Sequence, residues 1–172
     1  REYDLDGNNF IERFVGPVIF RFGLEDAISA GILCPFEYVP IPYELTDDDL
    51  ARLQQVFKKQ AVRASEGCPM SEEEVWRDLA MVYKTAEMKP ILLDRFLADR
   101  PSCLSRSMIF VETIEYGMRI ADVVQRYRKD FHTYFGGTDA EVLSRFAVGE
   151  LDVLISCHRL SEGIDIRSTS TV

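Results

Sequence analysis

From residue 101 onward the chain alternates short apolar runs with amphipathic segments, and this alternation restricts the fold more than any other sequence feature. Apolar runs typical of buried strands alternate with segments of helical spacing: strands 107–111, 131–135 and 152–156, helices 114–128 and 138–148. Strands joined through helices by short loops form parallel sheets. Each helix carries the chain back to the end of the sheet at which the previous strand began, so the next strand runs in the same direction. The pattern predicts an α/β fold, a parallel sheet flanked by helices, with a fourth strand starting at residues 170–172.

Residues 46–99, ahead of this α/β region, predict an α-helical insert. Thr46 can cap one helix, and Ser71 with Glu74 has the spacing of a capping box that starts a second. A third helix begins near Pro90, since proline is tolerated in a first helical turn. Much of the acidic excess of the chain lies in this insert, on faces that we expect to be solvated.

The N-terminal residues predict a segment separate from the sheet. The run 18–22 suits a short strand after a Gly-Pro turn, and residues 24–30 suit a short helix that ends at a glycine. We therefore expect two regions, 1–36 and 37–172. Because the chain does not start with Met and stops inside a predicted strand, we expect it to be a fragment of a larger protein.

Charge and cysteine usage exclude several classes of function. The chain has 20 basic and 29 acidic residues, a formal charge of −9, so any nucleic-acid contact needs a local patch rather than bulk charge. The four cysteines include no CxxC pair and the chain has only two histidines, which predicts no metal site. Free thiols favour a cytoplasmic location. No apolar run approaches the roughly 20 residues that span a bilayer, so we expect no membrane partner.

The common catalytic motifs are absent from these residues. The chain contains no GxxxxGK[ST] phosphate loop and no GxSxG nucleophile elbow. Its acidic residues are scattered over predicted helices and form no convincing acid and base pair. We therefore predict no catalytic residue here, and the chain alone does not have the features of a complete enzyme.

Ligands of open parallel sheets bind at the carboxyl ends of the strands, and three segments of this chain lie there. These segments are 112–113, 136–138 and 157–166. The glycine pair of the second could bind an anion at a helix N-terminus, although a plain tight turn explains it as well. The third segment combines cations, hydroxyls, a glycine and two carboxylates, a composition that suits phosphate oxygens, and an ordinary loop is its alternative.

Residues 134–166 resemble the second RecA-like lobe of superfamily 2 helicases and translocases, particularly the restriction and DNA-repair branch. Residues 108–113 are similar to motif IV of that family, a strand of the form "-IFV-T". Motif V, "-L-EG-D-P", is matched by Leu160, Glu162, Gly163, Asp165 and Ile166, and Arg167 stands where the family usually has the proline. Residues 22–38 are similar to the linker that enters the second lobe. The resemblance implies that region 1–36 is an interlobe linker and that 37–172 is a RecA-like helicase C-terminal lobe.

The resemblance also implies roles for individual residues. The glycine and aspartate of motif V face the ATP cleft between the lobes, which implies nucleotide binding by Gly163 and Asp165. Hydroxyls at the strand ends of motifs IV and V touch the nucleic-acid backbone in this family, and two cations stand beside them here. The candidates for nucleic-acid contacts are Thr113, Ser156, His158 and Arg159.

The family's P-loop and Mg²⁺ motif belong to its first lobe, and its arginine-finger motif follows the region matched here. Phosphoryl transfer depends on all of these parts, so we expect the isolated chain to bind neither ATP nor Mg²⁺ and to be inactive. The parent protein is then expected to be an ATP-dependent helicase that uses ATP and Mg²⁺, with DNA or RNA and its first RecA-like lobe as partners. The alternative is a non-catalytic α/β binding or docking module that kept the fold and lost the motor.

Overall fold

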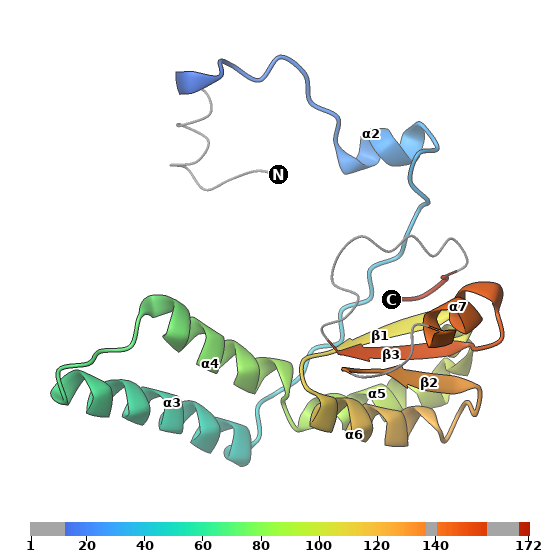
Figure 1. Cartoon of the computed structure of the whole chain (residues 1–172). Coiled ribbons are helices and arrows are strands. Elements are labelled where there is room, and N and C mark those ends of the chain that lie inside the picture. The colour runs from blue at the N-terminus through green and yellow to red at the C-terminus, as the bar shows by residue number, and fades with distance from the viewer. Residues whose placement is uncertain (1–12, 137–140, 158–168) are drawn as a thin grey trace. The chain divides into compact units, whose positions relative to one another are not determined.

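The computed structural model describes residues 13–136, 141–157 and 169–172 (Figure 1). Contacts within the chain divide it into two compact units, Arg1–Pro40 and Ile41–Val172. The sequence predicts a boundary after residue 36, and the contacts place the division after Pro40. Each unit is described by itself below.

In the first unit the predicted short helix forms as α2 (Leu24–Ser29). The N–H of Gly23 donates to the carboxylate of Asp26 at 2.9 Å, which closes the first turn. Gly31 has a φ of 69°, the left-handed conformation with which glycine commonly ends a helix. The run 18–22 is coil and not the predicted strand, because no second strand lies beside it in the described part of this unit.

The second unit is built on a three-stranded parallel sheet of β1 (Ser107–Val111), β2 (Phe131–Tyr134) and β3 (Val153–Cys157). The strand order is β1-β3-β2, so the last of these strands in the sequence lies between the other two. Thr171 forms a parallel bridge with Ser107, where the sequence predicts the start of a fourth strand. The predicted α/β fold with a parallel sheet is confirmed.

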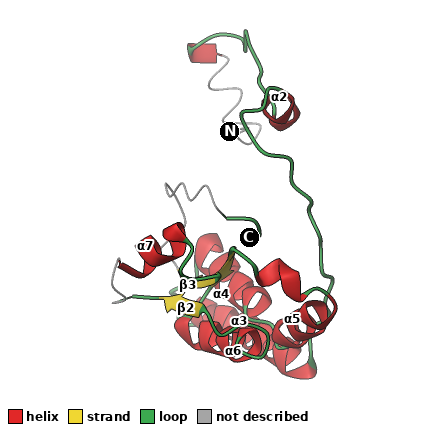
Figure 2. Cartoon of the chain, turned by 90° about the vertical axis from the view of Figure 1, so that its right-hand side faces the viewer, coloured by secondary structure: helices red, strands yellow, loops and turns green. Residues whose placement is uncertain are grey.

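Helices cover both faces of this sheet (Figure 1, Figure 2). On one face lie α5 (Met88–Asp99), the short 3₁₀-helix η1 (Pro101–Leu104) and α6 (Ile114–Val124). The other face carries α7 (Glu141–Val148). The predicted helix 114–128 is shorter than expected, since α6 ends at Val124 and turns lead into β2.

The side chains of β3 alternate between the two faces, as a strand requires. Val153 and Ile155 join the apolar cluster under α5 and α6, while Leu154 joins Phe146 in the cluster under α7. All five residues of β3 are buried. This full burial is typical of the central strand of a parallel sheet that is covered on both sides.

The predicted insert forms three helices, of which only two leave the α/β core. Helices α3 (Asp47–Ser65) and α4 (Glu72–Lys84) pack mainly against each other as an antiparallel hairpin beside the sheet (Figure 1). The predicted cap at Thr46 and the predicted capping box of Ser71 with Glu74 are both formed. Helix α5 instead packs on α6 and buries Leu97, so it is part of the core.

Helix α6 approaches the sheet closely because Gly117 has no side chain. A Cβ at this position would lie 2.6 Å from the ring of Phe135, which is too short for packed atoms, and 3.0 Å from Val111, which is very tight. Gly117 is buried against the sheet, as this close approach requires. α6 therefore packs closely on the sheet, and it begins at Ile114, shortly after β1 ends at Val111.

Two contacts fasten the start of α6 to the segment between α4 and α5. The Tyr116 hydroxyl donates to the Ala86 carbonyl at 2.8 Å, and burial raises the pKa of Tyr116 to about 12, so it remains a donor. The Arg119 guanidinium donates to both oxygens of Glu87, at 2.9 and 2.6 Å. Such a two-point contact holds direction as well as distance.

Candidate nucleic-acid interface

The six predicted site residues divide between described and undescribed parts of the chain. Thr113 and Ser156 lie in the described part, at the carboxyl ends of β1 and β3. The other four predicted residues, His158, Arg159, Gly163 and Asp165, lie outside the described residues. The predictions for those four therefore stay predictions.

The carboxyl ends of β1 and β3 lie side by side. Val111 is paired in register with Cys157, so the segments that follow both strands leave the same edge of the sheet. The Cys157 thiol donates to the Glu112 carbonyl at 3.4 Å and links these two strand ends. Burial, with a smaller contribution from the Glu112 charge, raises the pKa of Cys157 and keeps the sulfur a neutral donor.

Thr113 is the N-cap residue of α6. Its hydroxyl oxygen accepts a hydrogen bond from the Tyr116 N–H at 3.1 Å. A hydroxyl also has one proton to donate, and within the described part of the chain this proton has no acceptor. The side chain is partly exposed, so the structure leaves it able to donate to an anion at the strand end.

Thr113→Ala is expected to lower the free energy of unfolding by about 1 kcal/mol, because the first turn of α6 loses its side-chain cap. Thr113→Ser keeps the hydroxyl and is expected to stay within about 0.5 kcal/mol of the wild type. Urea denaturation followed by far-UV circular dichroism measures both. Equal stability of the alanine variant and the wild type would contradict the capping role.

Ser156 is buried in the centre of the sheet, unlike a residue that contacts a ligand at the surface. Its side chain is 0% exposed, and its Oγ is the one buried side-chain oxygen or nitrogen without a hydrogen-bond partner among the described residues. It pairs in register with Phe110 on β1 and with Tyr134 on β2. In this conformation the hydroxyl does not reach the surface, so a nucleic-acid contact through it requires the covering residues to move.

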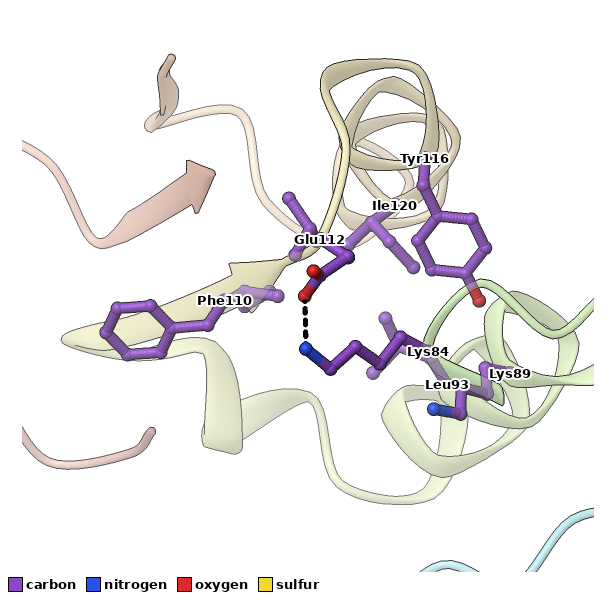
Figure 3. Close-up of a pocket in the computed structure, with 9 residues that line it drawn as sticks. Lys84, Lys89, Leu93, Phe110, Glu112, Tyr116 and Ile120 are labelled. Atoms are coloured by element: carbon purple, nitrogen blue, oxygen red, sulfur yellow. Dashed lines mark ion pairs between the residues drawn. The ribbon is translucent and has the colours of Figure 1, made fainter. Parts of the chain in front are cut away.

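A pocket of about 380 Å³ opens beside the carboxyl end of β1, and the sequence does not predict it. Its lining comes from the end of α4, from α5, α6 and β1, and comprises Lys84, Lys89, Leu93, Ile109, Phe110, Val111, Glu112, Tyr116 and Ile120. Figure 3 shows Lys84 pointing from the end of α4 toward Glu112, with a distance of 2.9 Å between ammonium and carboxylate. No sequence motif marks this pocket, because its walls are separated along the chain and meet only through packing.

Comparisons with protein families and with curated proteins find no match to this chain. Among the described residues, no group of three or more histidine, cysteine or acidic side chains is arranged to hold a metal ion. Within the same described ranges, no helix combines the length and the apolar character needed to cross a membrane.

Proposed function

We propose that this chain is the second motor lobe of an ATP-dependent nucleic-acid helicase or translocase of superfamily 2, related to restriction and DNA-repair motors. In this role it contributes nucleic-acid contacts and one wall of an ATP cleft whose other wall belongs to a first RecA-like lobe. The isolated chain has no hydrolytic activity of its own.

The observation that supports this proposal is the placement of the strand ends that resemble motifs IV and V. β3 lies at the centre of the parallel sheet, beside β1. Both strands end on the same side of the sheet, and Thr113 lies just after the end of β1. The centre of a parallel sheet, at its carboxyl edge, is where open α/β folds bind ligands. Residues 158–166, which resemble motif V, follow β3 directly in the sequence.

The proposal assigns two separate roles to the candidate residues at the carboxyl end of the sheet. Gly163 and Asp165 face the nucleotide, whereas Thr113, His158 and Arg159 face the nucleic-acid backbone. Ser156 belongs to the second group only in a conformation that uncovers it, because its hydroxyl is buried here.

In the motor protein that carries this lobe, Asp165→Ala is expected to reduce nucleic-acid-stimulated ATPase by more than tenfold while nucleic-acid affinity changes less than twofold. Arg159→Ala is expected to do the reverse and to lower the salt slope of single-strand binding by about 0.7, the contribution of one phosphate contact. ATPase assays and fluorescence anisotropy across a salt series measure the two activities.

Two results would reject the motor proposal. The first is a coding sequence upstream of Arg1 that lacks both a P-loop and an acidic Mg²⁺ motif, since phosphoryl transfer needs them. The second is equal damage to ATPase and nucleic-acid binding from each of the two variants. The first result would favour the alternative, a non-catalytic α/β docking module.

A further inference from the structure

The pocket beside β1 has an apolar floor. Four aliphatic side chains line it: Leu93 on α5, Ile120 on α6, and Ile109 with Val111 on β1. All four belong to the apolar cluster under α5 and α6, and Leu93, Ile109 and Val111 are only partly buried. Because Ile109 and Val111 are two residues apart on β1, their side chains point to this same face of the sheet. The pocket therefore leaves apolar surface that a ligand can cover.

The size and position of the pocket suit a small molecule. Its volume of about 380 Å³ lies within the range of small-ligand sites. Its walls come from α4 and α5 of the helical insert and from α6 and β1 of the core. All of these elements belong to the second unit of the chain, so the pocket is contained in one compact body.

Two lysines give the pocket a positive charge in a chain that is strongly acidic overall. Lys84 is the last residue of α4, Lys89 is the second residue of α5, and Glu112 faces Lys84 from the end of β1 (Figure 3). These three charged residues give the described lining a formal charge of +1, against −9 for the chain. A local positive site in an acidic chain favours an anion as its ligand.

Lys89 is the strongest indication that this anion binds beside the apolar floor. It lies one helical turn before Leu93 on α5, so the two side chains share a face of the helix. The Lys89 side chain is partly buried, and its ammonium lies 4.8 Å from the ring centre of Tyr43. Burial lowers the pKa of Lys89, and within the described part of the chain no carboxylate pairs with it. A bound anion would supply the opposite charge that this lysine lacks.

Lys84 adds a second cation that is only partly used. Its ammonium lies 2.9 Å from the Glu112 carboxylate, which is the single partner of this side chain among the described residues. An ammonium has three protons to donate, so one ion pair does not exhaust it. Lys84 therefore strengthens the positive field at the rim of the pocket.

We propose that this pocket binds a small carboxylic acid with an apolar chain, its carboxylate paired with Lys89 and its chain on the aliphatic floor. A fully hydrated anion such as inorganic phosphate suits the site less well, because it leaves the four aliphatic side chains exposed. The inference goes beyond the proposed function and does not depend on it. An occupant of this kind would join the helical insert to β1 through contacts with both.

Titration of the 172-residue chain with hexanoate, followed by amide NMR spectra, tests the assignment. The shift changes are expected to be concentrated at the residues that line the pocket. Hexanol and hexylamine carry the same chain without the negative charge and are expected to bind at least about tenfold more weakly, since they cannot form the charge-assisted pair. Shorter carboxylates are expected to lose affinity about fourfold for each methylene removed, the effect of one buried methylene.

Variants of Lys89 separate the charge from the rest of the side chain. Lys89→Gln is expected to weaken hexanoate binding about tenfold, the effect of one charge-assisted contact, whereas Lys89→Arg keeps the charge and is expected to stay within about threefold of the wild type. Lys58→Gln is the matched control, because it removes the same charge at an exposed position of α3 outside the pocket. It is expected to change the affinity less than about twofold.

Glu112→Gln tests the charge of the pocket in the opposite direction. It removes the acidic side chain of the described lining and frees Lys84, so it is expected to tighten hexanoate binding about threefold. Glu66→Gln, at an exposed position after α3 and outside the pocket, is its control and is expected to tighten binding less than about twofold.

Four results would overturn the assignment. Equal affinity for hexanoate and hexanol would show that the lysines hold no carboxylate. Inorganic phosphate that shifts the same amides with the affinity of hexanoate would show that the apolar floor takes no part. Equal effects of Lys89→Gln and Lys58→Gln, or no hexanoate binding to the wild-type chain, would reject the pocket as the site. The motor proposal would stand in each case, because it is tested by Asp165 and by the upstream sequence.

Discussion

Phe146→Ala is expected to lower the free energy of unfolding by about 3–5 kcal/mol, the usual loss when a buried aromatic ring is removed from a packed core. The Phe146 side chain is 0% exposed and packs with Leu154 of β3 between α7 and the sheet. Its ring also faces the Arg106 guanidinium, 4.6 Å from the ring centre. α7 covers this face of the sheet, so few neighbouring side chains can move in to fill the cavity.

Val148→Ala is the matched control for this variant, because Val148 lies on the same helix and is 74% exposed. It is expected to change stability by less than about 0.5 kcal/mol. Chemical denaturation followed by circular dichroism gives both values. A loss for Phe146→Ala as small as that for Val148→Ala would mean that α7 does not close the core as described.

The sequence predicts the strands and helices of the core well, because burial imposes local patterns. β3 is apolar at every position except Ser156, and such a run indicates a strand covered on both faces. The strand order β1-β3-β2 is not predicted from the sequence. The order depends on which strands pair with each other, and this pairing goes together with the packing of α6 and α7 on opposite faces of the sheet.

The helical insert shows where local pattern is insufficient. The pattern of 46–99 predicts helices correctly but does not distinguish the hairpin of α3 and α4 from α5, which joins the core. The difference comes from contacts distant in sequence, such as the Arg119–Glu87 ion pair. The same limit applies to the candidate site, where Thr113 follows a recognisable strand but Lys84 and Lys89 reach β1 only through the fold.

Asp49→Ala is expected to lower the free energy of unfolding by about 3 kcal/mol, because it removes one partner of a buried charged network. The Asp49 side chain is 0% exposed. Its carboxylate accepts hydrogen bonds from the Thr46 N–H and hydroxyl at 3.2 and 3.0 Å, from the Glu87 N–H at 3.2 Å and from Arg52 at 3.2 Å. Arg52 in turn donates to the Thr85 hydroxyl at 2.6 Å. One carboxylate thus ties the start of α3 to the connection between α4 and α5.

The matched control is Asp48→Ala, an exposed acidic residue in the same first turn of α3. Both variants remove one negative charge near the positive end of the helix, an effect of about 0.3–1 kcal/mol. Only Asp49→Ala removes the four hydrogen bonds, so its loss of stability is expected to exceed that of Asp48→Ala by about 2 kcal/mol.

The pH dependence of this stability loss shows whether Asp49 acts through its charged hydrogen bonds or only through packing. Burial of Asp49 acts to raise its pKa, but hydrogen bonds from the Thr46 and Glu87 backbone, the Thr46 hydroxyl and the Arg52 charge outweigh burial and hold the pKa below its ordinary value. A carboxyl group with a lowered folded pKa stabilises the fold above its unfolded pKa of about 3.9, and this contribution is lost as the pH falls through the folded value. The stability difference between wild type and Asp49→Ala should therefore be full near neutral pH and shrink as the pH falls below about 4. A difference that stays constant over that range, measured by urea denaturation at each pH, would show that Asp49 acts by packing alone.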